Sequence, residues 1–388
     1  MRILYVADGR SPTALSWIEY FVNAGHEVHL ASPFECSTNL DLRSISFVPV
    51  AFSGSAGSAE NRNLRKKLPT GLRTRLRNWL GPATVKRAAR PLNILIDNVK
   101  PDLVHAMRVP YEGMLAAAAN PSARLLVSVW GNDFTLHARA NSLMARATRR
   151  TMQRADALHT DTQRDQHLAS KWGFQSTKPN IILPGNGGVR SEIFYPLVNP
   201  EQERESAARL RVINPRGIRA YVRNDIFFQA IPKVLASRPE ARFFCPGMEG
   251  EREALDWVNA LKLHDYVTLM PTLSPLALSD TYHSAQAMVS PSTHDGTPNS
   301  LLEAMASGVL PVASNLETIR EWITHGENGL LFDPLDSNDL ASAIVRALKD
   351  TKLRAHAAEI NAKMISERAD YNANMKTAED FYELVSAL

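Results

Sequence analysis

Residues 2–31, RILYVADGRSPTALSWIEYFVNAGHEVHLA, predict the first strand, helix and strand of the chain. The apolar run Arg2–Ala7 predicts a buried strand, and apolar residues at helical spacing from Trp17 to Phe21 predict a helix that ends at Gly25. Glu27–Ala31 predicts the next strand. A strand, a helix and a strand in this order form a β-α-β unit, from which a parallel sheet grows.

The same alternation continues along the chain. Further strands are predicted in the first half at Leu103–Ala106, Leu125–Val129 and Ala157–Thr160. A second series of strands is predicted, with helices between them, at Ala241–Cys245, Val267–Met270, Ala287–Val289, Leu310–Ala313 and Leu330–Phe332. The pattern predicts an α/β protein with two Rossmann-like domains that face each other across a cleft.

The expected domain boundary is the segment Pro184–Pro200, which is rich in Gly, Asn and Pro. We expect an N-terminal domain over residues 1–190 and a C-terminal domain over 191–369, with a final helix over 370–388 that packs back on the first domain. A length of 388 residues also fits two domains better than a single core.

The composition is that of a soluble globular protein, with 44% hydrophobic and 22% charged residues. The first residues lack the long apolar core of a secretory signal, and no run of about 18 apolar residues occurs. The two cysteines, Cys36 and Cys245, form no Cys-x-x-Cys pair and are expected to be ordinary thiols. We therefore expect a cytoplasmic protein.

Positive charge is concentrated in the first half of the chain. Residues 1–200 hold 25 Lys+Arg against 14 Asp+Glu, a difference of +11, whereas the rest holds 19 against 26, a difference of −7. Residues 62–90 contain ten of these cations and no acid, with leucines and Trp79 at helical spacing, and we expect breaks at Pro69 and Gly81-Pro82. Two interpretations remain open: contact with an anionic membrane surface or phosphorylated acceptor, or a solvated helix face over the core. Nucleic acid is not expected as a partner, because no nucleic-acid-binding motif accompanies the charge.

The stretch most informative about chemistry is residues 290–308, SPSTHDGTPNSLLEAMASG. A strand ends near Ser290, a turn of Gly296, Thr297 and Pro298 follows, and Asn299 or Ser300 is expected to cap the next helix. The N–H groups at a helix start suit a diphosphate. Asp295 and Glu303 flank this point and could accept hydrogen bonds from sugar and ribose hydroxyls. By itself, the stretch is better explained as a capped helix whose dipole favours a nearby acid.

This stretch resembles the acidic-x7-acidic donor motif of the retaining glycosyltransferases of family 4, also called group 1, and in particular their bacterial polysaccharide and lipopolysaccharide members. The similarity continues through residues 309–334, and segment 184–196 resembles the segment between the family's two domains. The resemblance implies the GT-B fold, with the first acid, Asp295, on the donor sugar and the second, Glu303, on the ribose. Asp295 is one methylene shorter than the usual Glu. The donor pocket would also include Leu301.

Residues 214–225, NPRGIRAYVRND, lie where the family places an arginine and a lysine on the donor diphosphate. Arg216 or Arg219 would be the first cation, and Arg223 would replace the lysine. Guanidinium groups in these positions would stabilise the negative charge that develops on the leaving group.

The N-terminal half resembles the family less closely, and it supplies four further candidates. Gly9, in Asp8-Gly-Arg-Ser-Pro12, would let the backbone approach a ligand. His105 matches the first histidine of a family strand, although a buried histidine is an equal alternative. Glu112, and Asp133 in Trp130-Gly-Asn-Asp, are candidates for the acceptor side.

No Asp-x-Asp pair and no Gly-x-Gly-x-x-Gly occurs, so we expect neither a metal nor a nicotinamide cofactor. The resemblance implies transfer of a UDP- or GDP-linked sugar to a glycan or lipid-linked acceptor in cell-surface polysaccharide synthesis, in the cytoplasm or at the inner membrane face. Two alternatives are an epimerase or phosphorylase of the same fold, and a non-catalytic nucleotide-sugar-binding protein.

Overall fold

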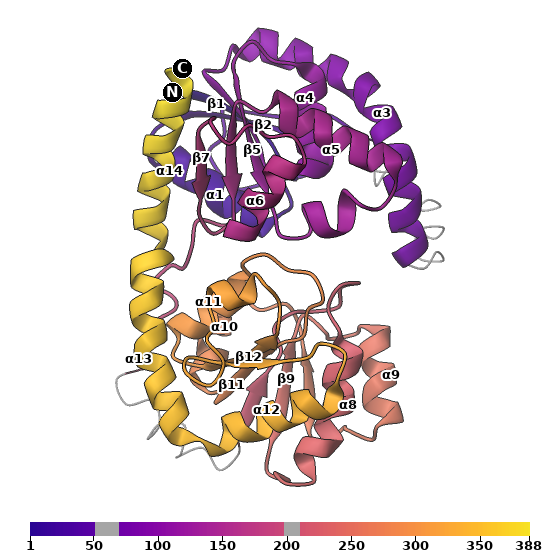
Figure 1. The fold of residues 1–388 in the computed structure, drawn as a ribbon, viewed down its shortest axis with the longest axis vertical. Coiled ribbons are helices and arrows are strands. Elements are labelled where there is room, and N and C mark those ends of the chain that lie inside the picture. Colours follow the sequence, from indigo (N-terminus) through magenta and orange to yellow (C-terminus); the bar gives the residue numbers. More distant parts are fainter. Residues whose placement is uncertain (51–69, 198–209) are drawn as a thin grey trace. The chain divides into compact units, whose positions relative to one another are not determined.

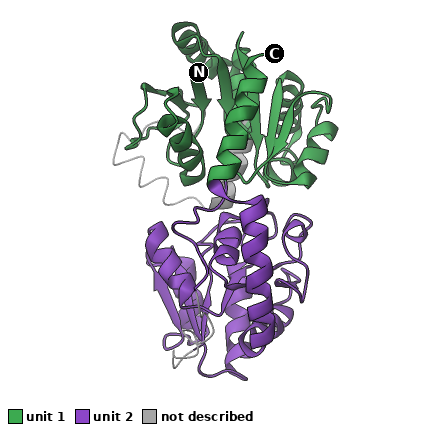
Figure 2. Cartoon of the chain, turned by 90° about the vertical axis from the view of Figure 1, so that its left-hand side faces the viewer, with its two compact units in different colours: residues 1–187, 372–388 green, residues 188–371 purple. Residues whose placement is uncertain are grey.

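The computed structural model describes residues 1–50, 70–197 and 210–388, and gives only the backbone for residues 70–78 and 80. The chain divides into two compact units (Figure 2). Unit 1 comprises Met1–Gly187 and Asn372–Leu388, and unit 2 comprises Gly188–Tyr371. The last helix therefore belongs almost wholly to the unit that contains the N-terminus.

Unit 1 is built on a seven-stranded parallel sheet with the order β3-β2-β1-β4-β5-β6-β7 (Figure 1). The strands are β1 (Arg2–Val6), β2 (Glu27–Ser32), β3 (Ser44–Phe47), β4 (Leu103–Ala106), β5 (Arg124–Val129), β6 (Ala157–Thr160) and β7 (Asn180–Ile182). The helices are α1 (Pro12–Asn23), α3 (Thr70–Val99), η1 (Val109–Gly113), α4 (Met114–Ala119), η2 (Asp133–His137), α5 (Ser142–Arg154), α6 (Gln163–Lys171) and α14 (Tyr371–Ser386).

The two faces of this sheet are covered by different helices. Alternate strand residues, such as Leu4 and Val6, share one core cluster with buried residues of α3, α4 and α5. The residue between them, Tyr5, points to the opposite face, where its ring lies 6.2 Å from that of Phe21 on α1 and 6.5 Å from that of Tyr382 on α14. Both faces of the sheet are therefore buried, as expected for a parallel sheet.

Unit 2 has a six-stranded parallel sheet with the order β10-β9-β8-β11-β12-β13. Its strands are β8 (Arg211–Ile213), β9 (Arg242–Pro246), β10 (Val267–Met270), β11 (Ala287–Ser290), β12 (Leu310–Ser314) and β13 (Leu330–Phe332). The helices are α8 (Asn224–Leu235), α9 (Arg252–Ala260), α10 (Pro275–His283), α11 (Asn299–Ala306), η3 (Ile319–Glu321), α12 (Ser337–Lys349) and α13 (Thr351–Arg368). Core clusters lie on both sides of the sheet, one with α8 and α12 and one with α10 and α11.

The predicted α/β fold with two Rossmann-like sheets is confirmed, and the predicted strands are all present within one residue at each end. Strands β3, β7 and β8 were not predicted; β3 and β7 lie at the two edges of their sheet and contain no fully buried residue. The predicted break at Gly81-Pro82 is wrong, since α3 continues through it. Residues 62–69 of the predicted basic segment lie outside the described residues. None of the described helices combines the length and apolar character needed to cross a bilayer.

Packing explains why α3 continues through Gly81-Pro82. A Cβ atom at Gly81 would lie 2.2 Å from the ring of Tyr111, so only glycine allows the helix to come so close to η1. The hydroxyl of Thr84 donates to the Gly81 carbonyl at 2.9 Å. Beyond this point the helix buries Leu92 and Ile96 in the core, which offsets the hydrogen bond that Pro82 cannot form.

A buried hydrogen-bonded chain ties α14 to the sheet of unit 1. Tyr382 of α14 contacts His105 Nδ1, His105 Nε2 lies 2.7 Å from Ser128 Oγ, and Ser128 Oγ lies 2.8 Å from His159 Nδ1. The other end is fixed, because His159 Nε2 lies 2.9 Å from the carbonyl of Leu183, which can only accept.

That carbonyl sets the direction of every bond in the chain. His159 donates from Nε2, so its Nδ1 accepts from Ser128, which in turn accepts from Nε2 of His105. His105 Nδ1 then accepts from the Tyr382 hydroxyl, whose oxygen also receives the indole N–H of Trp17 at 2.8 Å. The pattern requires both histidines to be neutral. Burial lowers the pKa of His159 to about 4. Burial also lowers the pKa of His105 well below its usual value, and repulsion from His159, whenever that ring is protonated, lowers it further.

These neutral histidines predict that unit 1 loses stability in weak acid. Unfolded histidine titrates near pH 6.5, whereas the folded pair does not bind protons there, so the free energy of unfolding should fall below about pH 6.5 by up to about 1.4 kcal/mol per pH unit for each histidine. The loss is measured as a fall in the thermal midpoint between about pH 7 and pH 5. Hydrogen exchange of the β4 amides over the same range shows that unit 1 is the part that opens. His159→Gln should make the slope shallower. A midpoint independent of pH in this window would contradict the assignment.

Candidate functional site

The switch point of the sheet in unit 2 lies between β8 and β11, because strands on either side of this pair run in opposite chain order. Loops that follow the two strands therefore leave the same edge of the sheet and diverge to opposite faces, which is where α/β proteins bind ligands. The loop after β8 carries Arg216, and the loop after β11 carries Asp295. The two segments selected from the sequence are thus brought to one edge.

Backbone hydrogen bonds hold these two loops together. The N–H of Arg223 donates to the carbonyl of Pro291 at 2.6 Å, and the N–H of Thr293 donates to the carbonyl of Tyr221 at 2.8 Å. Val222 and Ser292 form an antiparallel bridge between these bonds. The loops consequently form a short two-stranded ribbon that fixes the position of the arginines relative to Asp295.

Arg216 lies at the centre of a polar cluster beside this ribbon. Its side chain is 6% exposed and forms an ion pair with Asp295, with 2.5 Å between Nη2 and Oδ2. Nη1 donates to Ser300 Oγ at 3.1 Å, and Nη2 lies 3.5 Å from Ser292 Oγ. Nε is buried, and no acceptor in the described part of the chain reaches it. A buried cation with an unused donor is suited to a further anionic ligand.

Glu303 lies one turn into α11, where its carboxylate interacts electrostatically with the Arg216 guanidinium. Burial raises the pKa of Glu303 to about 7, and the nearby Arg216 guanidinium opposes part of this rise. No donor among the described residues forms a hydrogen bond with this carboxylate. It is therefore a half-buried acceptor that hydroxyl groups of a ligand could satisfy.

The start of α11 differs from the expectation. Neither Asn299 nor Ser300 caps the helix: Pro298 is the N-cap residue, and no side chain forms the capping hydrogen bond. Ser300 instead accepts from Arg216, while the indole of Trp322 donates to Thr297 at 3.1 Å and steadies the turn. Gly296 and Leu301 are buried beside them. The positive end of the helix dipole thus points towards the ion pair without a side-chain cap.

The other two arginines from the sequence lie at the edge of this cluster. Arg223 forms a bidentate pair with Asp225, at 2.8 Å and 2.6 Å, and both side chains are partly exposed. Arg219 is exposed and donates to the hydroxyl of Tyr221 at 3.1 Å. Of the two candidates for the first cation, only Arg216 contacts the acidic motif.

Unit 1 has a cavity of about 270 Å³ at the corresponding switch point, between β1 and β4. Its walls come from the loops that follow β1, β2, β4 and β5, and they are Asp8, Arg10, Ser11, Phe34, Met107, Arg108, Pro110, Tyr111, Glu112, Trp130 and His137. The cavity joins aromatic rings to paired charges, since Arg10 pairs with Asp8 at 2.9 Å and lies 3.6 Å above the Phe34 ring.

Asp133 does not line this cavity but holds two of its lining residues, Arg108 and Trp130, in place. Its side chain is fully buried and accepts hydrogen bonds from Arg108 Nη2 at 2.7 Å and from the N–H groups of Val109 and Trp130, at 2.9 Å and 3.2 Å. Arg108 has φ +144°, a conformation that favours glycine. The structure thus makes Asp133 a positioning residue for a strained Arg108, and brings Glu112 rather than Asp133 to the cavity wall.

Two family descriptions match the sequence, one on each unit. "Glycosyl transferase 4-like" matches residues 2–162, and "Glycosyl transferases group 1" matches residues 218–350, which include the Arg216 loop from residue 218 on and the whole acidic motif.

The chain belongs to the group 1 glycosyltransferases, family 4.

Curated relatives in this family match parts of the chain. A phosphatidyl-myo-inositol mannosyltransferase of Mycolicibacterium smegmatis is 26% identical over 194 residues, 48% of either chain. A 2-deoxystreptamine N-acetyl-D-glucosaminyltransferase of Niallia circulans is 29% identical over 123 residues, 31% of this chain and 32% of that protein. The chain spans less than half the length of these relatives.

Solved structures share the GT-B fold over the full length. Sucrose-phosphate synthase from Thermosynechococcus elongatus has a TM-score of 0.77 at 14% identity, and Anabaena HepE in complex with UDP-glucose has a TM-score of 0.72 at 16% identity, each covering 100% of both chains. At these identities the likeness shows the fold alone.

Two family-based candidates in unit 1 form structural contacts. His105 is fully buried in the hydrogen-bonded chain to Tyr382, so it is not placed to contact a substrate. A Cβ atom at Gly9 would lie 2.3 Å from Cys36 Sγ, so the close approach to Cys36 already requires glycine here. In contrast, Arg10 and Arg108 of the cavity were missed, although each follows a strand at the switch point, and this position could have indicated them.

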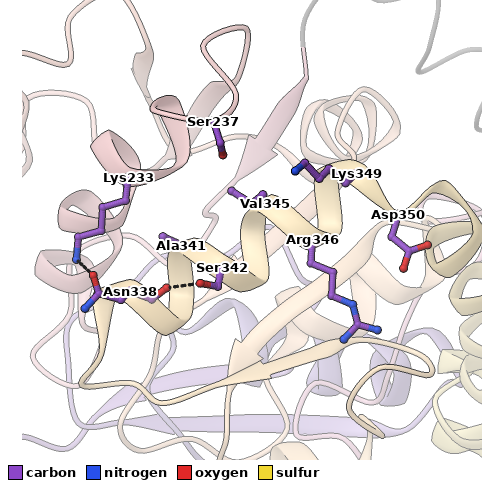
Figure 3. A pocket seen from close by; sticks show the side chains of 9 residues that line it. All are labelled: Lys233, Ser237, Asn338, Ala341, Ser342, Val345, Arg346, Lys349 and Asp350. Carbon is purple, nitrogen blue, oxygen red and sulfur yellow. Dashed lines mark hydrogen bonds between the residues drawn. The ribbon is translucent and has the colours of Figure 1, made fainter.

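A groove of about 870 Å³ on unit 2, along α8 and α12, contains none of the predicted residues (Figure 3). Lys233 donates to Ser337 and Asn338 at its rim, while Arg346 and Lys349 extend to different sides of α12 (Figure 3). The cations therefore do not converge on one ligand. Outside residues 51–69 and 198–209, no three His, Cys, Asp or Glu side chains could jointly hold a metal ion. The absence of a metal requirement stays a prediction from the sequence.

The buried pair predicts a large stability effect at Asp295. Asp295→Ala would leave Arg216 buried without its carboxylate and should lower the free energy of unfolding of unit 2 by about 3 kcal/mol. Asp225→Ala is the matched control, because it breaks the partly exposed pair with Arg223 and should cost at most about 1 kcal/mol. Urea unfolding followed by circular dichroism measures both, and equal losses would show that the Arg216 pair is not desolvated.

Proposed function

We propose that this protein is a retaining glycosyltransferase that takes a sugar from a UDP- or GDP-linked donor bound to unit 2. The observation that carries the proposal is the cluster at the switch point, in which Arg216, Asp295 and Glu303 surround the uncapped start of α11. Diphosphate, sugar and ribose present an anion and hydroxyl donors, and this cluster offers a buried cation and two carboxylates. HepE, which shares the fold, has been crystallised with UDP-glucose.

Each donor-site residue has a proposed part. Arg216 and Arg223, with Arg219 at the rim, balance the charge of the diphosphate together with the dipole of α11, and no metal ion or cofactor is required. The 296–301 turn, residues Gly296, Thr297, Pro298, Asn299, Ser300 and Leu301, forms the floor. Asp295 accepts from the sugar hydroxyls and Glu303 from the ribose hydroxyls.

The proposed reaction exchanges one bond at the anomeric carbon. The bond from this carbon to the diphosphate oxygen breaks, and a bond to the acceptor oxygen forms on the same face. The departing diphosphate takes the proton of the acceptor hydroxyl. No side chain acts as a nucleophile, so rate enhancement comes from positioning and from stabilisation of the leaving charge by the arginines.

We propose the cavity of unit 1 as the acceptor site. Its aromatic walls, including Trp130 and Tyr111, suit the apolar face of a sugar ring, while Glu112 and Arg108 can orient hydroxyl groups. The strain at Arg108, of about 1–3 kcal/mol, is also typical of a ligand site. The acceptor would be a glycan or lipid-linked saccharide in the synthesis of a bacterial cell-surface polysaccharide, made in the cytoplasm at the inner membrane face.

Donor binding predicts a thermal shift that depends on Glu303. At about 100 times its dissociation constant, a UDP- or GDP-sugar should add about 2.7 kcal/mol to the stability of unit 2. Glu303→Ala should abolish most of this shift, whereas Glu359→Ala, which removes an exposed carboxylate from α13, should keep it. Equal shifts in both variants would remove Glu303 from the site. Conversion of the donor without any acceptor would favour an epimerase, and stable binding without slow donor hydrolysis would favour a non-catalytic protein.

The raised pKa of Glu303 predicts pH-dependent donor binding. Its carboxylate accepts ribose hydrogen bonds best when ionised, so affinity for UDP-glucose should increase as the pH rises through about 7, by up to about tenfold per pH unit below this value. Titration calorimetry between about pH 6 and pH 8 measures the trend, since the diester phosphates of UDP-glucose do not titrate in this range. Glu303→Gln should flatten the profile. A profile that the glutamine variant leaves unchanged would assign the titration to another group.

A further inference from the structure

The exposed face of α3 carries cations and large apolar side chains in one stripe. Trp79, Lys86, Arg90 and Ile94 follow one another at spacings of seven, four and four residues, so they lie on one side of the helix. Trp79 is 58% exposed and Ile94 is 63% exposed, and Lys86, Arg87 and Arg90 are also exposed. The opposite side of the helix is buried on the sheet. Exposed aromatic and aliphatic side chains that stand among cations on one side of a helix are typical of helices that lie in a membrane interface.

Helix α5 extends this surface. It packs next to α3 on the same face of the sheet (Figure 1), so the exposed sides of both helices look away from the sheet. Its exposed side carries Arg146, Arg149 and Arg150, and Leu143 is 37% exposed near its start. The surface formed by the exposed residues of α3 and α5 is called the basic face below.

The basic face has almost no compensating negative charge. Helices α3, α4 and α5 contain a single acidic residue, Asp97, in the last turn of α3. None of the described residues forms an ion pair with Lys86, Arg90, Arg146 or Arg150. The positive charge of the basic face is therefore directed to the solvent.

We propose that the basic face docks unit 1 on an anionic lipid bilayer. The cations would attract the lipid phosphates, and Trp79, Ile94 and Leu143 would enter the interface between head groups and acyl chains. A bilayer fits better than nucleic acid or a soluble polyanion. Phosphates alone would pair with the cations but would not bury the three exposed apolar side chains among them. The proposal rests on the proposed function in one respect: docking would bring the protein to a lipid-linked acceptor.

Vesicle flotation of the full chain tests the proposal. The protein should float with vesicles of phosphatidylcholine mixed with phosphatidylglycerol, and should not float with phosphatidylcholine alone. The triple variant Lys86→Glu, Arg90→Glu and Arg150→Glu should lower the partitioning at least about a hundredfold, since each cation near an anionic surface contributes about fivefold. Trp79→Ala should lower it severalfold while keeping every charge. High salt should release the wild-type protein, because it screens exposed charges.

The matched control reverses three exposed cations of unit 2, with Arg252→Glu, Lys349→Glu and Lys352→Glu. It should bind vesicles like the wild type. Loss of binding in the control but not in the basic-face variant would overturn the proposal, as would wild-type protein that ignores phosphatidylglycerol or prefers an oligonucleotide. The shift with UDP-glucose, measured on the same variants, keeps docking separate from the proposed function. An unchanged thermal shift with UDP-glucose shows that the triple variant is folded. If the wild type showed no such shift, that result would count against donor binding and would leave the docking proposal untouched.

Discussion

Every strand in both sheets runs parallel to its neighbours, and this constraint determines where chemistry can be placed in the molecule. A parallel sheet sends the chain out of all its strands at one edge, and only at the switch point do the outgoing loops separate and leave room for a ligand. Arg216 and Asp295 follow the two strands at that point in unit 2. Arg10 and Arg108 follow the equivalent strands in unit 1. Both candidate sites therefore lie at the switch point of a parallel sheet.

Electrostatics explains why the cluster in unit 2 needs more than one cation. Arg216 is neutralised by Asp295, and Glu303 adds up to one negative charge, so the three side chains together attract no anion at long range. A diphosphate would bring about two further negative charges at neutral pH. The start of α11 and the partly exposed Arg223 can supply the missing attraction.

The sequence predicted those features that are written locally. Buried parallel strands are continuous apolar runs, so ten of them could be located, and the acidic motif could be placed between a strand and a helix. Strands β3 and β7 could not be located in this way, because they lie at the edges of their sheet and contain no fully buried residue, and β8 has only two buried residues.

Contacts that depend on distant partners could not be predicted for the same reason. Glycines Gly9 and Gly81 are explained by Cys36 and Tyr111, and the sequence gives no sign of either contact. His105 looks like a catalytic histidine until Tyr382, from the other end of the chain, is seen to bond to it. In α3 the local signal for a break, Gly81-Pro82, was overruled by the burial of the residues that follow.

The uneven charge of the chain can now be connected with its two units. Residues after 200 carry more acids than bases and include the proposed donor site, so that site cannot rely on net charge to attract a nucleotide sugar and must rely on local groups such as Arg216. The excess of bases lies in the other half, largely on helices whose buried sides already complete the core of unit 1. Because neither folding nor donor binding uses these cations, their concentration on one exposed face calls for a separate anionic partner, and the apolar side chains among them favour a bilayer.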